Sequence, residues 1–307
     1  MNSLRRFALF CSWAIAAALI AGQFGAFHPA ADSFSHLRLH LVVLALPFLL
    51  LLLITRSWIN GFLLAIVITV SIGSLGQLFG GTALAHAETG EDGRLRIISL
   101  NLNHNNADAG RVAAYIEEMR PDVVTLQEAA IESPRVTKRL KESYPHQVIC
   151  RYRGEVGIAV LSRTPFSETG CMNDHRLAWA TVSKDGKNTT VASLHLRWPY
   201  PLPQAEQIDA LSSVWDQLDT PLVITGDFNA VPWSHAVQKV AAQSGTRVVP
   251  GLRRSFTWGD NWLGDLMALP IDHALISPTL KVGGAALGPH VSSDHLPLIV
   301  DIETGAL

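Results

Sequence analysis

Cysteine is scarce in this sequence, with 3 among 307 residues. That scarcity excludes the disulfide framework that supports many small secreted domains. Cys11 lies in an apolar run, where we expect it to pack as a small hydrophobic side chain. Cys150 and Cys171 could pair in an oxidising compartment, although two cysteines at an arbitrary spacing are more often reduced and buried, so the sequence leaves their pairing open.

Charge is almost absent from the first 87 residues, where the only fully charged side chains are Arg5, Arg6, Asp32, Arg38 and Arg56. Removing them from the whole-chain counts of 24 basic and 26 acidic residues leaves 20 and 25, a formal net charge of −5 for the remainder. Nucleic-acid-binding proteins usually carry a basic surplus, because neutralising phosphates supplies most of their non-specific affinity. The composition therefore argues against such a protein, although a local basic patch stays possible.

Three long runs in this N-terminal segment contain no charged residue: residues 7–27, 39–55 and 58–81. Each is close to the roughly 20 residues that a helix needs to cross the hydrocarbon of a membrane. A signal peptide would account for the first run alone. The few polar residues in these runs form no polar face, which argues against a transport path. Residues 1–87 are therefore predicted to be a membrane anchor of about three transmembrane helices.

The basic residues near the runs predict an orientation. Arg5 and Arg6 precede the first run and Arg56 lies between the second and third, so the positive-inside rule assigns both places to the cytoplasm. Three crossings then place the rest of the chain outside. Arg38, on the other side, weakens this bias. We expect a multi-pass protein of the plasma (inner) membrane with an extracytoplasmic, periplasmic main domain.

Residues 88–93 are polar and turn-forming, which predicts a linker to a domain at 94–307. Asp108 can cap a helix that ends before Pro121, and residues 208–218 repeat the same amphipathic pattern. Strands alternating with helices predict an α/β domain. Short apolar runs predict its buried strands at residues 94–101, 122–127, 156–161, 190–196, 222–225, 271–276 and 296–302.

Polar side chains that suit metal and phosphate chemistry occur where these predicted strands begin or end. A single one would more often be a cap or turn former. Their recurrence at the ends of six strands predicts a shared site. In chain order they are Asn101, Asn103, Gln127, Glu128, His195, Asp227, Asn229, Asp272, His273, Ser293, Asp294 and His295.

Hydrolysis of a phosphate ester explains these residue types. The reaction needs neutralised phosphoryl oxygens, an oriented water and a stabilised leaving oxygen. A hard cation such as Mg²⁺ is held by one or two carboxylates, and Glu128 is the first candidate ligand. Asp227 and Asn229, two residues apart, suit alignment of water and support of its geometry. A carboxylate at Asp272 would orient His295 and raise its pKa, so that the charged ring donates to a phosphoryl oxygen.

Six stretches of the chain, in order, resemble the endonuclease/exonuclease/phosphatase superfamily. This family includes pancreatic-type deoxyribonuclease, abasic-site endonucleases, sphingomyelinases and inositol phosphatases. Any one stretch alone would be weak, whereas six in the family's order are specific. They are residues 97–101 (IISLN), 121–128 (PDVVTLQE), 193–196 (SLHL), 226–229 (GDFN), 270–273 (PIDH) and 293–295 (SDH).

The resemblance implies a fold and a metal. The fold is a deoxyribonuclease-like sandwich of two packed β-sheets with helices outside them, four layers in all. The metal is Mg²⁺ or Mn²⁺, with Glu128 as a ligand, Asn101 beside it and Asp294 near the ion. Asn103 lies beyond the family's asparagine and is expected only to shape the loop, as is His104.

The resemblance also implies roles for the other residues of the site. Asp227 aligns the attacking water and Asn229 supports the phosphate. Asp272 pairs with His295, and His195 contacts the phosphate or the leaving group. Asn101 joins Asn229 and His195 among the residues expected to bind substrate.

Several residues keep two interpretations. His273 is as well explained by a structural hydrogen bond as by catalysis. The segment 198–203, rich in aromatic residues and proline, could line the substrate site or be a rigid connector. Trp258 and Trp262 could meet a lipid surface or a base, although buried tryptophans are commoner.

The favoured function is hydrolysis of phosphate mono- or diesters at the membrane, with a lipid, a small molecule or a nucleic acid as substrate and no obligatory protein partner. A membrane-anchored DNA endonuclease or exonuclease acting outside the cytoplasm is the alternative. A non-catalytic ligand-binding module would be expected to lack one of Glu128, Asp227, Asp272 or His295, and all four are present.

Overall fold

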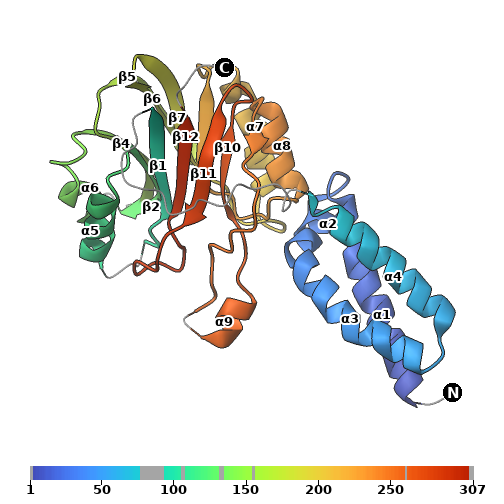
Figure 1. Cartoon of the computed structure of the whole chain (residues 1–307). Coiled ribbons are helices and arrows are strands. Elements are labelled where there is room, and N and C mark those ends of the chain that lie inside the picture. Colours follow the sequence, from blue (N-terminus) through green and yellow to red (C-terminus); the bar gives the residue numbers. More distant parts are fainter. Residues whose placement is uncertain are drawn as a thin grey trace.

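The computed structural model describes residues 3–76, 93–104, 108–130, 135–153, 156–259 and 261–303. Residues 3–76 form a group of helices, and the residues from 93 onward form a β-sandwich domain beside it (Figure 1). The predicted linker, residues 88–93, lies outside the described residues except for Gly93.

Three apolar helices make up the N-terminal part: α1 (Ser3–Ala21), α3 (Arg38–Ile54) and α4 (Trp58–Gly73), with the short α2 (Pro29–Ser33) in the first connection. Two helical stretches, Ser3–Phe24 and Pro29–Ile54, are long and apolar enough to cross a membrane, whereas α4 has 16 residues. Two segments rather than about three therefore reach the required length in the described part of the chain. The third predicted run, residues 58–81, extends past residue 76, where that part is interrupted.

These helices are apolar on their outward faces as well as on the faces that pack against one another. Leu19, Ala45 and Leu64 are buried where the three helices meet. Phe10 is 75% exposed and Ile59 76% exposed. These outward faces are apolar surfaces that no other described residue covers.

The main domain is built from two six-stranded sheets, as predicted. The first contains, in spatial order, β11 (Lys281–Leu287), β12 (Leu298–Glu303), β1 (Arg94–Asn101), β2 (Val123–Ala130), β4 (Val156–Ser162) and β3 (His146–Arg153). The second contains β5 (Phe166–Met172), β6 (Leu177–Lys184), β7 (Lys187–His195), β8 (Leu222–Asp227), β10 (Asp272–Ile276) and β9 (Arg247–Val248).

Helices cover the outer faces of both sheets, which gives the four layers that the resemblance implied. On the first sheet lie α5 (Ala109–Met119) and α6 (Arg135–Arg139), and on the second α7 (Gln204–Trp215) and α8 (His235–Gln243) (Figure 1). Asp108 caps α5 as predicted, accepting a hydrogen bond from the Arg111 amide at 2.9 Å.

Strand β1 shows how the sequence produces this layering. Its residues are buried from Leu95 to Asn101. Leu95 and Ile97 pack into the core between the sheets, whereas Ile98 and Leu100 pack under α5. Because successive side chains of a strand point to opposite faces, an uninterrupted apolar run is required when both faces are covered.

Cys150 in β3 and Cys171 in β5 form a disulfide, the pairing that the sequence left open. The bond joins edge strands of the two sheets. Neither strand was predicted from the sequence, and the Cα atoms are 5.6 Å apart only because the sandwich stacks these edges.

Candidate active site

Strand pairing brings the predicted polar residues to one edge of the sandwich. In the first sheet β1 runs parallel to β2, which places Asn101 beside Gln127 and next to Glu128. In the second sheet His195, at the end of β7, pairs with Asp227, at the end of β8. Asp272 begins the antiparallel β10 directly opposite Asp227. Residues as far apart in the chain as Asn101 and Asp272 thus meet at one place.

The side chains of the two sheets are joined by an amide. The Asn101 Nδ2 atom donates to Asp227 Oδ2 at 3.0 Å and lies 3.5 Å from Glu128 Oε1. His195 Nε2 lies 3.5 Å from Asp227 Oδ2 and 3.9 Å from Glu128 Oε1. Two carboxylates, an amide and an imidazole therefore surround one small volume.

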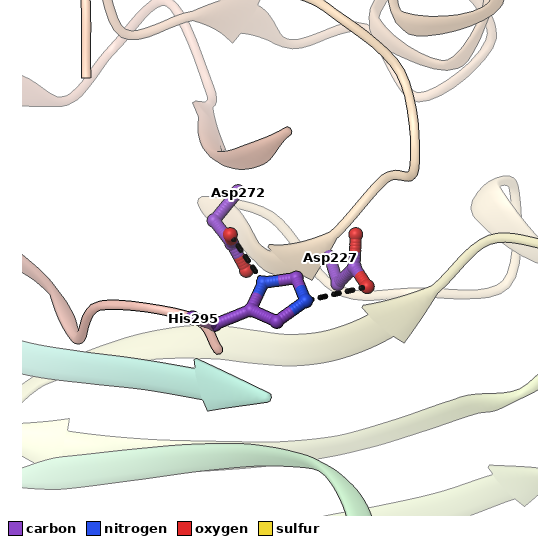
Figure 2. A group of neighbouring side chains, drawn as sticks. All are labelled: Asp227, Asp272 and His295. Carbon is purple, nitrogen blue, oxygen red and sulfur yellow. Dashed lines mark hydrogen bonds and ion pairs between the residues drawn. The ribbon is translucent and has the colours of Figure 1, made fainter. Parts of the chain in front are cut away.

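His295 lies between two carboxylates, Asp272 and Asp227 (Figure 2). Its Nδ1 atom is 2.7 Å from Asp272 Oδ2, and its Nε2 atom is 3.8 Å from Asp227 Oδ2. Burial works to lower the pKa of His295, but Asp272 and Asp227 outweigh it and raise the pKa to about 10. The ring is therefore cationic near neutral pH.

The Asp227 carboxylate is fixed at both oxygens. The Asn229 amide donates to Oδ1 at 2.8 Å, and Asn101 donates to Oδ2. Burial raises the pKa of Asp227 to about 7, against the opposing effect of the His295 charge. The preceding Gly226 has a φ of +152°, and a Cβ there would lie 1.9 Å from the Leu194 carbonyl oxygen, so only glycine allows β8 to end in this way.

Glu128 reaches the site through an irregularity in β2. The pairing of β2 with β4 shifts between Leu126 and Ala129, and Glu128 has a φ of +52°. His104 donates its amide to Glu128 Oε2 at 3.1 Å, and its Nδ1 atom lies 2.7 Å from the same oxygen. Burial works to raise the pKa of Glu128, but His195 and His104 reverse this and lower it. His104, expected only to shape its loop, contacts the proposed metal ligand directly.

Two residues of the site carried no signal in the sequence. The Tyr152 hydroxyl lies 3.1 Å from His195 Nδ1, and the Arg176 guanidinium lies 4.8 Å from the centre of the Tyr152 ring. Burial, followed by the nearby charge of Arg176, lowers the pKa of His195 to about 4 against the effect of Glu128, so this ring is neutral. Burial also raises the pKa of Tyr152, which keeps its proton.

Asp294 enters the site through Ser293, whose hydroxyl donates to the Asn101 carbonyl oxygen at 2.7 Å and lies 3.4 Å from Asp294 Oδ1. Asp227, Asp272 and His295 also form a group with ligand-type atoms within 4.8 Å of one another. A cation between these three would need a lone pair on His295, which is cationic and already donates to Asp272. Glu128, beside this group, is therefore the better candidate to hold a metal ion, and the Asn101 side-chain nitrogen, not its oxygen, faces Glu128.

Other candidates lie apart from this chemistry. Gln127 is fully buried and donates to the Ser193 hydroxyl at 2.9 Å, joining the two sheets. His273 Nε2 lies 2.7 Å from the Ala230 carbonyl oxygen, and burial lowers the pKa of the ring to about 4. The structural interpretation of His273 accounts for these contacts.

The N-terminal helices touch the segment that follows Asp227, a contact that the sequence did not predict. His36 Nε2 lies 3.2 Å from the Asn229 carbonyl oxygen. The Trp233 indole donates to the Ser35 carbonyl oxygen at 2.8 Å. The first connection of the predicted anchor therefore borders the site.

Comparison with known proteins agrees with this geometry. Residues 98–295 match the model of the Endonuclease/Exonuclease/phosphatase family. No curated protein matches the chain. Solved structures share the fold at low sequence identity. The D. rerio TDP2 complex with single-strand DNA product is 21% identical, covering 69% of this chain and 99% of that chain with a TM-score of 0.57. The human Nocturnin catalytic domain with bound sulfate is 17% identical, covering 69% of this chain and 95% of that chain with a TM-score of 0.55. A mutant of Staphylococcus aureus beta toxin with bound magnesium ions is 17% identical, covering 67% of this chain and 98% of that chain with a TM-score of 0.51.

Proposed function

Since the chain belongs to the endonuclease/exonuclease/phosphatase family and is a phosphoester hydrolase, we propose that it cleaves phosphate mono- or diesters at a membrane surface with the help of a divalent cation. The observation that carries the proposal is the buried junction of Asn101, Glu128 and Asp227 beside the His295–Asp272 pair. The junction supports the proposal because it gathers a carboxylate that can hold a cation, one that can align water and an imidazole that can donate to phosphate.

The residues fit a hard cation. Carboxylate oxygens from Glu128 and Asp294 are the type that Mg²⁺ or Mn²⁺ takes, and the bound magnesium of the beta toxin structure supports the same choice. The Asn101 side chain turns its nitrogen toward Glu128, and its oxygen accepts from the Asn103 backbone amide at 2.9 Å, so Asn101 would hold the Glu128 carboxylate rather than the ion. The cluster also holds more carboxylates than His295 alone can neutralise. When bound, the ion neutralises charge on the phosphoryl oxygens and makes a coordinated water more acidic.

Asp227 aligns the attacking water. Its two oxygens are held by Asn229 and Asn101, so its remaining lone pairs have a fixed direction. A pKa of about 7 suits a base that works near neutral pH, and a nearby cation would lower that value somewhat. Asn229 holds the carboxylate with its backbone amide, and its side-chain nitrogen donates to the Leu196 carbonyl oxygen at 2.8 Å, so support of the phosphate falls to Asn101.

The two histidines act in different protonation states. His295, cationic because of Asp272, donates from Nε2 to a phosphoryl oxygen. His195 is neutral, and the Tyr152 hydroxyl donates to its Nδ1 atom, which leaves the proton on Nε2, facing Asp227 and Glu128. His195 is thereby fixed as a neutral donor to the phosphate or the leaving oxygen.

The attachment to the membrane and its side are also part of the proposal. Exposed apolar faces on the N-terminal helices support the plasma membrane as location. The Cys150–Cys171 disulfide supports an oxidising, extracytoplasmic compartment, since such bonds rarely persist in the cytosol. The positive-inside rule assigns Arg5, Arg6 and Arg56 to the cytoplasm, which agrees with an extracytoplasmic main domain.

The test is a substrate panel with purified, detergent-solubilised protein. Plasmid DNA, lysophospholipids, sphingomyelin, inositol phosphates and bis(4-nitrophenyl) phosphate are assayed with Mg²⁺, with Mn²⁺ and with chelator. Asp227→Ala should lower turnover about 10³-fold or more, because the aligned water is lost. Equal turnover by this variant would refute the proposal for Asp227, and turnover that persists in chelator would refute the metal.

A DNA endonuclease or exonuclease is the second candidate. The fold shared with TDP2 in complex with single-strand DNA product favours it, and the net charge of −5 from residue 88 onward opposes it. Turnover of plasmid DNA in the same panel, with a steep loss on adding salt, would select this candidate.

A further inference from the structure

The contact between the N-terminal helices and the main domain is polar and buried, which fixes their relative orientation. The Asp32 carboxylate, 8% exposed, accepts hydrogen bonds from the His235 and Ala236 amides at 2.8 and 2.9 Å, where α8 begins. With the Ser35–Trp233 and His36–Asn229 contacts, it holds the domain at one angle to α1 and α3. Any surface of the domain therefore has a set height relative to the predicted membrane helices.

One surface element lies level with the start of α3. Residues 256–259 lead away from the site, residues 261–271 form the short helix α9 (Trp262–Leu266) and return, and α9 projects beyond the ends of the strands (Figure 1). His40, in the first turn of α3, lies with its Nε2 atom 3.0 Å from the Leu266 carbonyl oxygen. Val43 and Leu44, one turn further along α3, are 60% and 50% exposed. The apolar surface of α3 thus begins beside α9.

Three apolar side chains of α9 are exposed, beside the exposed carboxylate of Asp265. Trp262 is 77% exposed, Leu266 56% and Leu263 52%, so of the two interpretations of Trp262 the structure excludes burial. Arg254, also exposed, donates to the Asp265 carbonyl oxygen of the same helix at 2.9 Å. Elements that lie in a lipid–water boundary combine tryptophan and leucine, which contact the acyl chains of the lipid, with arginine at the level of the headgroups.

Aromatic rings connect α9 with the catalytic cluster. The Phe256 ring packs on His295 with ring centres 4.9 Å apart and on Trp258 at the same distance. Trp258 and Trp198 are 5.9 Å apart, and they are 58% and 41% exposed. An apolar wall therefore runs from the phosphate-binding histidine to the face that carries α9.

We propose that α9 inserts into the interfacial layer of the bilayer that holds α1 and α3, and that the site consequently acts on the phosphate ester of a membrane phospholipid headgroup. The inference rests on the proposed function, since it names the substrate class of that same site. The wall of Phe256, Trp198 and Trp258 receives the apolar part of the lipid next to the glycerol. The occupant is lipid rather than protein because the α9 surface continues into the apolar face of α3.

Depth-dependent quenching of tryptophan fluorescence tests the insertion. The full-length protein is reconstituted into vesicles of phosphatidylcholine, phosphatidylethanolamine and phosphatidylglycerol, with part of the phosphatidylcholine brominated on its acyl chains. Comparison with Trp262→Phe isolates the signal of Trp262 among 8 tryptophans. Insertion predicts that the Trp262 component is quenched by bromine and shielded from aqueous iodide. A Trp262 component that iodide quenches and bromine does not would overturn the proposal.

Turnover in the same vesicles tests the substrate. Leu263→Glu with Leu266→Glu should lower hydrolysis of the vesicle phospholipids about tenfold or more, because two charged side chains replace exposed apolar ones that insertion would bury in lipid. Hydrolysis of water-soluble bis(4-nitrophenyl) phosphate by this variant should stay within about twofold of the unaltered protein. The matched control is Ile149→Glu on the edge strand β3, an exposed apolar residue that should leave both activities unchanged.

The outcomes separate the two proposals. Loss of both activities in Asp227→Ala supports the catalytic assignment whatever α9 does. Equal lipid hydrolysis by the Leu263/Leu266 variant, or cleavage of the soluble ester with no cleavage of any vesicle lipid, overturns the inference about α9 and leaves the phosphoesterase standing. A change from dimer to monomer in that variant, without a change in bromine quenching, would assign the surface to a second copy and also overturn it.

Discussion

Replacing Asp272 by asparagine isolates the charge that keeps His295 protonated. The asparagine amide oxygen can still accept from His295 Nδ1, so the ring keeps its orientation while it loses its anionic partner at 2.7 Å. Asp272 is the largest of the influences that raise the pKa of His295, to about 10. Removing an opposite charge at this distance lowers a pKa by about 1–3 units, or about 1.4–4 kcal/mol of preference for the charged form.

The sign of the effect on activity follows from the donor role. Hydrolysis needs His295 protonated. The contribution of His295 to activity is therefore complete below its pKa and is lost as the pH rises through that pKa. In the unaltered protein this loss falls near pH 10. With a downward shift of about two units, Asp272→Asn would hold about tenfold less protonated His295 at pH 9.

The assay is kcat/KM for bis(4-nitrophenyl) phosphate between pH 6 and pH 10, with the exposed Asp219→Asn as control. The variant should stay close to the unaltered protein at pH 6 and fall behind it about tenfold by pH 9. An unchanged alkaline limb, or a loss of equal size at every pH, would refute the electrostatic role of Asp272.

Three further predictions concern stability, measured as unfolding in detergent. Asp32→Ala should lower the free energy of unfolding by about 2–4 kcal/mol, because two amides of α8 lose their buried acceptor, and an unchanged Tm would contradict the contact. The Cys150–Cys171 disulfide joins residues 21 positions apart, and its reduction should lower the free energy of unfolding by about 3 kcal/mol. Reductant should therefore lower the Tm of the unaltered protein but not that of the Cys150→Ser variant. Burial holds the pKa of His273 at about 4, below its unfolded value of about 6.5, so the unfolded chain binds more protons in that window. The free energy of unfolding should fall by up to about 3 kcal/mol between pH 6.5 and 4, less so in His273→Gln.

The sequence predicted the buried strands better than the edge strands. Strand β1 was expected at residues 94–101 and is found there, because a strand covered on both faces is uniformly apolar. Strand β5, at the edge of its sheet, has mostly exposed side chains and no apolar run. Strand β11, also at an edge, contains two adjacent glycines. Helix α8 had a readable signal in its Ser234 cap and apolar Val237 and Val240, but it was not predicted.

For the site, the sequence indicated which residues meet but not how they are held. Glu128, Asp227 and His295 were recognisable because they end or begin apolar strands in a family order. Tyr152 carried no such mark, since its contact with His195 depends on how two sheets stack. Trp262 kept two interpretations, exposed or buried, because its exposure depends on where the α9 segment projects. Such properties follow from tertiary packing, which local patterns do not encode.

The most direct test of the central claim is to measure Mn²⁺ binding and turnover together on the same samples. Electron paramagnetic resonance counts the bound Mn²⁺ of the unaltered protein and of Glu128→Gln, while bis(4-nitrophenyl) phosphate reports hydrolysis. A single cluster of Glu128, Asp227 and His295 predicts that Glu128→Gln loses metal affinity and turnover in parallel, and that excess Mn²⁺ restores part of both. Tight Mn²⁺ binding by Glu128→Gln, or full turnover without bound Mn²⁺ in chelator, would contradict it.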